Sequence, residues 1–111
     1  MDVAETREGA VTVVKPMGPL VSGDANDFLR RVDEVRTRSL GRFVIDASSI
    51  AFLDSQGLEA LLTVSESVSD SGQFLRMCGA NETVREVLEL TEIADRFEHY
   101  VDVNSAVRSF L

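Results

Sequence analysis

Apolar residues follow two different spacings along the chain, and the two spacings alternate. Four short runs rich in apolar and β-branched residues are typical of strands, and they cover residues 10–15, 42–48, 73–79 and 96–101. Between and after these runs, apolar residues recur every three or four positions. That spacing predicts helices over residues 22–40, 55–71, 82–90 and 104–111. The chain therefore alternates strand and helix four times.

This alternation is typical of an α/β domain with a largely parallel sheet, because parallel strands need a crossover connection between them. We expect a small mixed sheet of four or five strands with about four packed helices, in one domain that spans residues 1–111. Ser22 and Asn81 stand where two of the helices begin, and both residue types are favoured helix caps.

The junction before the second predicted helix reads FLDSQGLEALL, residues 52–62. Asp54 and Ser55 separate an apolar segment from a helical apolar pattern. Either residue can cap the helix, and capping alone would explain why polar residues stand at this junction. A helix N-terminus also favours negative charge, so Ser55 is a suitable place for a phosphate group of about −1.5 to −2 charges. The local chemistry leaves both interpretations open.

Gly57 lies in the first turn of the same helix, where glycine costs about 0.5–1 kcal/mol relative to alanine. A side chain at this position would block either a neighbouring segment of the chain or a docking partner. Binding sites in parallel α/β sheets gather in the loops after the carboxyl ends of the strands. We therefore expect the junction at Asp54 and Ser55 to form such a site.

The formal net charge is −8 and the pI is about 4.5, so a nucleic-acid partner and an anionic membrane surface are both poor matches. A basic face on a protein partner fits better. The single cysteine, Cys78, suits a reducing compartment and a core position. The polar first ten residues are unlike a signal peptide, and no apolar run reaches the length of a membrane span. We expect a cytoplasmic protein without direct membrane insertion.

Catalytic chemistry has little support in this sequence. A serine hydrolase needs a histidine and an acid beside its serine, and the only histidine, His99, falls in the last predicted strand. One histidine and one cysteine make no metal-ligand spacing, and no glycine loop with lysine is present to hold phosphates. We expect no enzyme activity, no catalytic residue, no metal and no cofactor. If Ser55 is phosphorylated, the ATP belongs to a partner.

The sequence IDASSIAFLDSQGLEALL, residues 45–62, resembles the central motif of the STAS domain, a family named for sulfate transporters and anti-sigma factor antagonists. That motif is a strand ending in Asp, a turn, an apolar pair and then Asp-Ser-x-Gly-Leu. Asp46, Phe52, Asp54, Ser55 and Gly57 match it, followed by Leu58. The segments PMGPL and VLELTEIADRFEHYVDVNSAV are similar to the parts before the first helix and at the end of the family fold. The resemblance covers nearly the whole chain and implies a STAS-like fold.

What the resemblance implies about function is a bacterial partner switch. A stand-alone antagonist of this family binds an anti-sigma factor that is also a serine kinase of the GHKL type, and the sigma factor is released. The kinase then phosphorylates the serine after Asp, here Ser55, and its affinity for the antagonist falls. A phosphatase resets the cycle. The expected partner-binding residues surround Ser55: Val21, Ser22, Asp54, Gln56, Gly57, Glu59, Ala60 and Thr63.

Three positions differ from the family pattern: Pro19, Val21 and Gln56 stand where Glu, Asp and Ser or Thr are common. The differences at Pro19 and Val21 motivate an alternative outside sigma control, in which the chain is a structural partner of a lipid-transport ATPase or of a signalling scaffold. A third idea, nucleotide binding by the domain itself, is known among STAS domains but finds no motif in this sequence.

Overall fold

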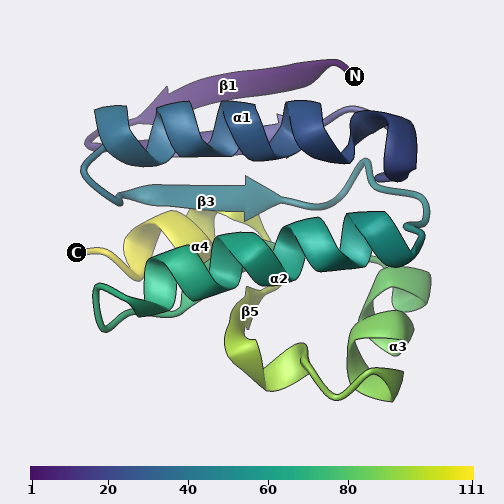
Figure 1. Ribbon diagram of the computed structural model, residues 1–111. Coiled ribbons are helices and arrows are strands. Elements are labelled where there is room, and N and C mark those ends of the chain that lie inside the picture. The colour runs from purple at the N-terminus through teal and green to yellow at the C-terminus, as the bar shows by residue number, and fades with distance from the viewer.

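The computed structural model describes all 111 residues and has one five-stranded sheet in the order β1-β2-β3-β4-β5 (Figure 1). The strands are β1 (Val3–Glu8), β2 (Val11–Pro16), β3 (Phe43–Asp46), β4 (Leu75–Cys78) and β5 (Phe97–Tyr100). The helices are α1 (Ser22–Arg38), α2 (Ser55–Ser69), α3 (Glu82–Leu90) and α4 (Val103–Arg108), and a short 3₁₀ turn covers Ala94–Arg96. None of the helices combines the length and the apolar composition that a membrane span needs.

Strands β2 to β5 are parallel, and β1 is antiparallel to β2, so the predicted mixed, largely parallel α/β fold is confirmed. Each parallel pair is joined by a crossover helix, as the alternating pattern requires. All four residues of β3 are buried, because helices cover both faces of the sheet at its centre.

The larger core lies between the sheet and the three helices α1, α2 and α3. Its residues include Phe28, Ile45, Leu61 and Leu88, all with no measurable solvent exposure. A smaller core on the opposite face packs Val11, Val44 and Cys78 against Ala106 of α4. Helix α4 alone among the four helices contributes buried residues to that face (Figure 1).

Cys78 is the small core residue that the sequence predicts. Its side chain is 1 % exposed. Burial, reinforced by the carboxylates of Asp46 and Asp102, raises the pKa of its thiol to about 12. The thiol therefore stays protonated and unreactive at neutral pH.

Strand β1 is absent from the sequence-based prediction, which has no strand before residue 10. Five of its six residues are exposed, so it carries no apolar signal. It adds to β2 through backbone pairing along its whole length, from Val3 opposite Pro16 to Glu8 opposite Val11. A strand held by its backbone at a sheet edge can keep a polar sequence, and charge on an edge also discourages aggregation.

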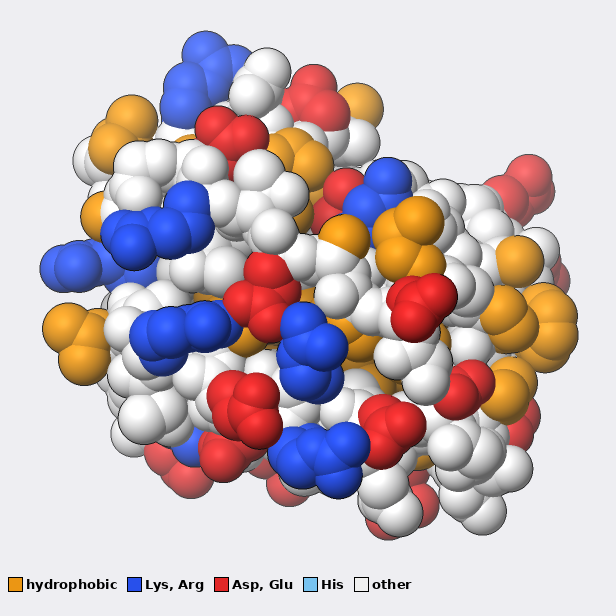
Figure 2. Space-filling view, turned by 90° about the horizontal axis from the view of Figure 1, so that it is seen from above, with side chains coloured by type: hydrophobic (Ala, Val, Ile, Leu, Met, Phe, Trp, Pro, Cys, Tyr) orange, Lys and Arg blue, Asp and Glu red, His pale blue; other side chains and the backbone are white.

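All four arginines of α1 are paired with acids. The Glu5 carboxylate of β1 accepts from Arg31 at 2.6 Å and also from Arg38. Arg30 and Arg36 bond to Asp27 and Asp33 one turn earlier in the helix, at 2.8 and 2.6 Å. On the face seen from above, basic and acidic side chains are interspersed (Figure 2). The run of arginines is therefore not an isolated basic patch.

A close backbone contact joins the segment before α1 to the start of α2. The Leu20 N–H donates to Phe52 O at 3.0 Å, and the Asp54 N–H donates to Leu20 O at 3.2 Å. A Cβ atom on Gly57 would lie only 2.0 Å from the Leu20 carbonyl oxygen. Of the two explanations for Gly57, the structure supports collision with a neighbouring segment.

We predict that Gly57→Ala destabilises the fold by about 1–3 kcal/mol, the usual cost of forcing an extra carbon into a filled space. The matched control is Gly23→Ala in the first turn of α1, where a Cβ meets nothing within 4 Å. That change should be neutral or slightly stabilising, since alanine is the better helix former. Urea unfolding of both variants measures the difference, and equal stabilities would contradict the Leu20 contact.

Candidate functional site

The candidate site lies where helices α1 and α2 begin. Both helices lie on the same side of the sheet and start at the same end of the molecule, beyond the carboxyl ends of β2 and β3 (Figure 1). This is the end of a parallel sheet at which loops carry binding sites. Both helices also direct their positive dipole ends to this region.

Asp54 joins the two helix starts through a single carboxylate. One oxygen, Oδ1, accepts the backbone N–H of Gly57 in α2 at 2.9 Å. The other, Oδ2, accepts the backbone N–H of Ser22 in α1, also at 2.9 Å. These bonds, with the Gly57 bond the stronger influence, hold the pKa of the Asp54 carboxyl below its ordinary value. Asp54 is therefore ionised at neutral pH and caps two helices at once.

The sequence-based prediction of a Ser22 cap on α1 is wrong. Ser22 is the first helical residue, the N-cap position belongs to Val21, and no side chain of the preceding loop makes a capping bond. Asp54 supplies that bond from 32 positions further along the chain. The Asn81 cap on α3 is confirmed, since its Oδ1 accepts the Val84 N–H at 2.8 Å.

The loop that leads into α2 is fixed from two sides. On one side it pairs with Leu20, which forms an isolated parallel bridge with Leu53. On the other side the Asn81 side-chain amide donates to Ile50 O at 3.2 Å and to Ala51 O at 3.1 Å. The sequence predicts Asn81 only as a cap. It cannot show the contact with residues 50 and 51, because that contact depends on how β3 and β4 pair.

Ser55 occupies the first position of α2 and is exposed. Because Asp54 makes the capping bond, the Ser55 hydroxyl is not needed to close the helix end. The two interpretations of the junction thus apply to different residues: Asp54 is the cap, and Ser55 presents a hydroxyl to solvent. A hydroxyl in this position is accessible to another protein's active site.

The other predicted partner-binding residues differ in how far they are exposed to solvent. Ser22, Gln56, Glu59 and Thr63 are exposed, while Val21 and Asp54 are partly buried. Gly57 and Ala60 are buried, and Ala60 is only 2 % exposed. These two residues face the interior and shape the helix start without presenting a side chain to a partner.

Phe52 is an exposed apolar residue that the list of predicted contacts omits. Its side chain is 51 % exposed, two residues before Asp54. In the sequence it reads as part of an apolar run before the helix, and nothing in that run distinguishes it from the fully buried Ile50. An exposed aromatic side chain beside a candidate site is a common feature of protein interfaces.

The sequence model of the STAS domain family matches residues 3–106. The chain belongs to the STAS domain family. The part of the chain that resembles the central STAS motif includes Asp54 and Ser55, at the start of α2 described above. The predicted membership and STAS-like fold are both confirmed.

Solved structures with the same STAS fold include stand-alone anti-sigma factor antagonists. A suggested antagonist from Thermotoga maritima has a TM-score of 0.87 and 24% identity, covering 96% of this chain and 92% of that one. An antagonist from Mycobacterium paratuberculosis has a TM-score of 0.83 and 22% identity, covering 97% and 92%. The antagonist SpoIIAA in its unphosphorylated form has a TM-score of 0.75 and 12% identity, covering 98% and 96%. At these identities the likeness establishes the fold.

We predict that Asp54→Asn lowers the unfolding midpoint of this STAS domain at pH 7, because an amide offers one acceptor where the carboxylate uses two. The Asp54 pKa is lower in the folded chain than its ordinary value of 3.8, so its stabilisation is present above that pH and is lost as pH falls through the folded value. The gap between wild type and variant should therefore be constant near neutrality and narrow below about pH 4.

The matched control is Asp70→Asn, which removes the same charge at the C-cap of α2. A carboxylate is unfavourable at that end of a helix, so this change should be neutral or slightly stabilising. Thermal unfolding followed by circular dichroism between pH 2.5 and pH 7 makes both comparisons. A gap that does not depend on pH would show that the Asp54 charge is unimportant.

Proposed function

We propose that this STAS protein is an anti-sigma factor antagonist that binds an anti-sigma serine kinase and is switched by phosphorylation of Ser55. The observation that carries the proposal is the division of labour at the start of α2, where Asp54 caps two helices and leaves Ser55 exposed. The serine can then be modified without breaking the bonds that hold the site together. SpoIIAA, a structural neighbour, is known in unphosphorylated and phosphorylated forms, which supports the same chemistry here.

Phosphorylation of Ser55 would change the surface far more than the fold. The phosphate would add about −1.5 to −2 charges beside an Asp54 carboxylate that is already ionised. The two helix dipoles partly offset this repulsion within the chain. A kinase docked against the same helix start would meet the full charge and bulk. Affinity therefore falls while the domain stays folded.

The unmodified surface around Ser55 fits a protein partner. It combines exposed polar residues, Ser22, Gln56, Glu59 and Thr63, with the exposed aromatic ring of Phe52. Aromatic residues surrounded by polar ones are typical of interfaces that form and separate. The phosphoryl donor and catalytic base belong to the kinase, and a phosphatase would return the chain to its binding form.

A second candidate function is a structural STAS subunit that supports a lipid-transport ATPase or a signalling scaffold. The observation that favours it is Val21, an uncharged and partly buried residue beside the site where the family pattern commonly has a carboxylate. The two functions differ in the partner recovered from the native cell: a GHKL-type kinase supports the switch, and a transport ATPase supports the structural role.

We predict that Ser55→Ala abolishes phosphate uptake when the chain is incubated with labelled ATP and the anti-sigma kinases of its native cell. The matched control is Ser69→Ala, because Ser69 is an exposed serine at the other end of the same helix, outside the surface around Ser55. It should be labelled like the wild type. Equal labelling of the Ser55 variant, or loss of label in the Ser69 variant, would move the site elsewhere.

We further predict that Ser55→Asp weakens kinase binding by about tenfold or more, because the added carboxylate lies beside the ionised Asp54 and would lose its hydration in the interface. Ser55→Asn is the neutral control of similar size and should bind more tightly than the aspartate variant. Calorimetry with the kinase measures both affinities. If the two variants bind alike, charge at residue 55 is not the signal.

A further inference from the structure

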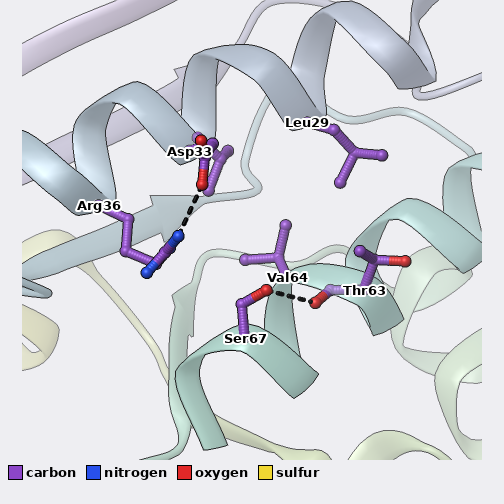
Figure 3. Close-up of a pocket in the computed structure, with 7 residues that line it drawn as sticks. Leu29, Asp33, Arg36, Thr63, Val64 and Ser67 are labelled. Atoms are coloured by element: carbon purple, nitrogen blue, oxygen red, sulfur yellow. Dashed lines mark hydrogen bonds and ion pairs between the residues drawn. The ribbon is translucent and has the colours of Figure 1, made fainter. Parts of the chain in front are cut away.

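A groove runs between helices α1 and α2 on the outer side of the molecule, away from Ser55. Its volume is about 180 Å³, and its floor is made of three aliphatic side chains, Leu29, Val32 and Val64. The rim contains Asp33 and Arg36 from α1, and Thr63 and Ser67 from α2 (Figure 3). We call this the α1–α2 groove.

The polar groups of the rim are satisfied within their own helices. Arg36 bonds to Asp33 at 2.6 Å. The Thr63 hydroxyl donates to Glu59 O at 3.0 Å, and the Ser67 hydroxyl donates to Thr63 O at 3.2 Å. Figure 3 shows the Asp33–Arg36 and Ser67–Thr63 contacts along the two walls. The α1–α2 groove therefore offers few unpaired polar groups to a ligand, and its aliphatic floor favours an apolar one.

The size of the groove restricts what can occupy it. Pockets for cofactors and nucleotides measure roughly 300–1,000 Å³, which exceeds the 180 Å³ found here. The volume is suitable for one large side chain. A side chain delivered by another protein gains apolar burial in the groove while the rest of that protein contacts the surrounding surface.

Helix geometry connects the groove to the phosphorylation site. Residues four apart are neighbours on a helix surface, so Ser55, Glu59, Thr63 and Ser67 form a stripe that winds gradually around α2 from its start to the groove. The rise from Ser55 to Thr63 is about 12 Å, well within the footprint of one partner. A protein that reaches Ser55 and follows this stripe comes directly to the groove.

The charge around the groove indicates what flanks the occupant. Glu59 lies one turn before Thr63 of the groove wall, and Asp70, the C-cap of α2, follows Ser67 by three residues. Neither carboxylate has an ion pair within the chain, and α2 has no basic residue. In a chain of net charge −8, these free carboxylates fit a partner segment with basic residues.

We propose that the kinase inserts one aliphatic side chain, from an amphipathic segment with flanking basic residues, into the α1–α2 groove. The inference rests on the proposed function and assigns the kinase a second anchor point away from Ser55. Because the groove is separate from the modified serine, its contribution is the same before and after phosphorylation. The groove would then contribute a constant part of the binding affinity, while phosphorylation of residue 55 would lower the total affinity.

To test the proposal, a longer side chain is placed on the α2 wall so that it fills the groove. In Ser67→Met the longer side chain covers the floor, and methionine is a good helix former, so the domain should stay folded. Kinase binding should weaken about tenfold or more, the effect of excluding one buried aliphatic side chain. The matched control is Ser69→Met, which lies on the opposite side of α2 beside Phe74 and should bind like the wild type. Equal unfolding midpoints of both variants confirm that only the surface has changed.

A third variant, Ser67→Ala, removes the hydroxyl without filling the space and should bind like the wild type. If it weakens binding as much as Ser67→Met, the occupant is polar and the inference is wrong. If Ser67→Met binds as tightly as the wild type while Ser55→Asp does not, the groove is no anchor and the phosphorylation switch stands. If none of the native anti-sigma kinases binds the wild type, the proposed function fails and this inference fails with it.

Discussion

One carboxylate organises the functional end of this protein. Asp54 accepts one backbone N–H from the start of α1 and another from the start of α2, each at 2.9 Å. The helix dipoles and the N–H groups stabilise its negative charge, and in return the charge holds both helix starts together. The Leu20 carbonyl fits against this junction only because residue 57 has no side chain. This small cluster of contacts fixes the start of α2, where the exposed Ser55 lies.

The same arrangement explains how a site can be modified without the fold being altered. In many helices the residue that caps the N-terminus is itself the exposed hydroxyl, so that modifying it would remove the cap. Here capping belongs to Asp54 and exposure belongs to Ser55. A charge added to Ser55 therefore acts mainly on whatever docks against the helix start. That separation is what a reversible partner switch needs, and the α1–α2 groove extends the proposed docking surface along the same helix.

Surface charge has different roles on the two neighbouring helices. On α1 two arginines are paired with acids of the same helix, and the other two, Arg31 and Arg38, bond to Glu5 and attach the edge strand β1 to the domain. On α2 the acids have no partner within the chain and remain available to another protein. The sequence shows both sets of charges, but which set is internally paired depends on the packing of β1 against α1.

The sequence by itself determined the α/β alternation, the three crossover helices and the position of the Asp54–Ser55 junction, because apolar spacing and turn residues are local properties. It could not reveal β1, whose polar side chains stay exposed while its backbone pairs. It also could not decide which residue caps α1, why residue 57 is glycine, or which predicted contacts are buried. Those answers come from hydrogen bonds of Leu20 and Ser22 with the segment that enters α2, and of Asn81 with the loop before it. These bonds span 30 to 34 positions that only the folded sheet brings together, and hydrogen bonds between distant segments leave no periodic pattern in a sequence.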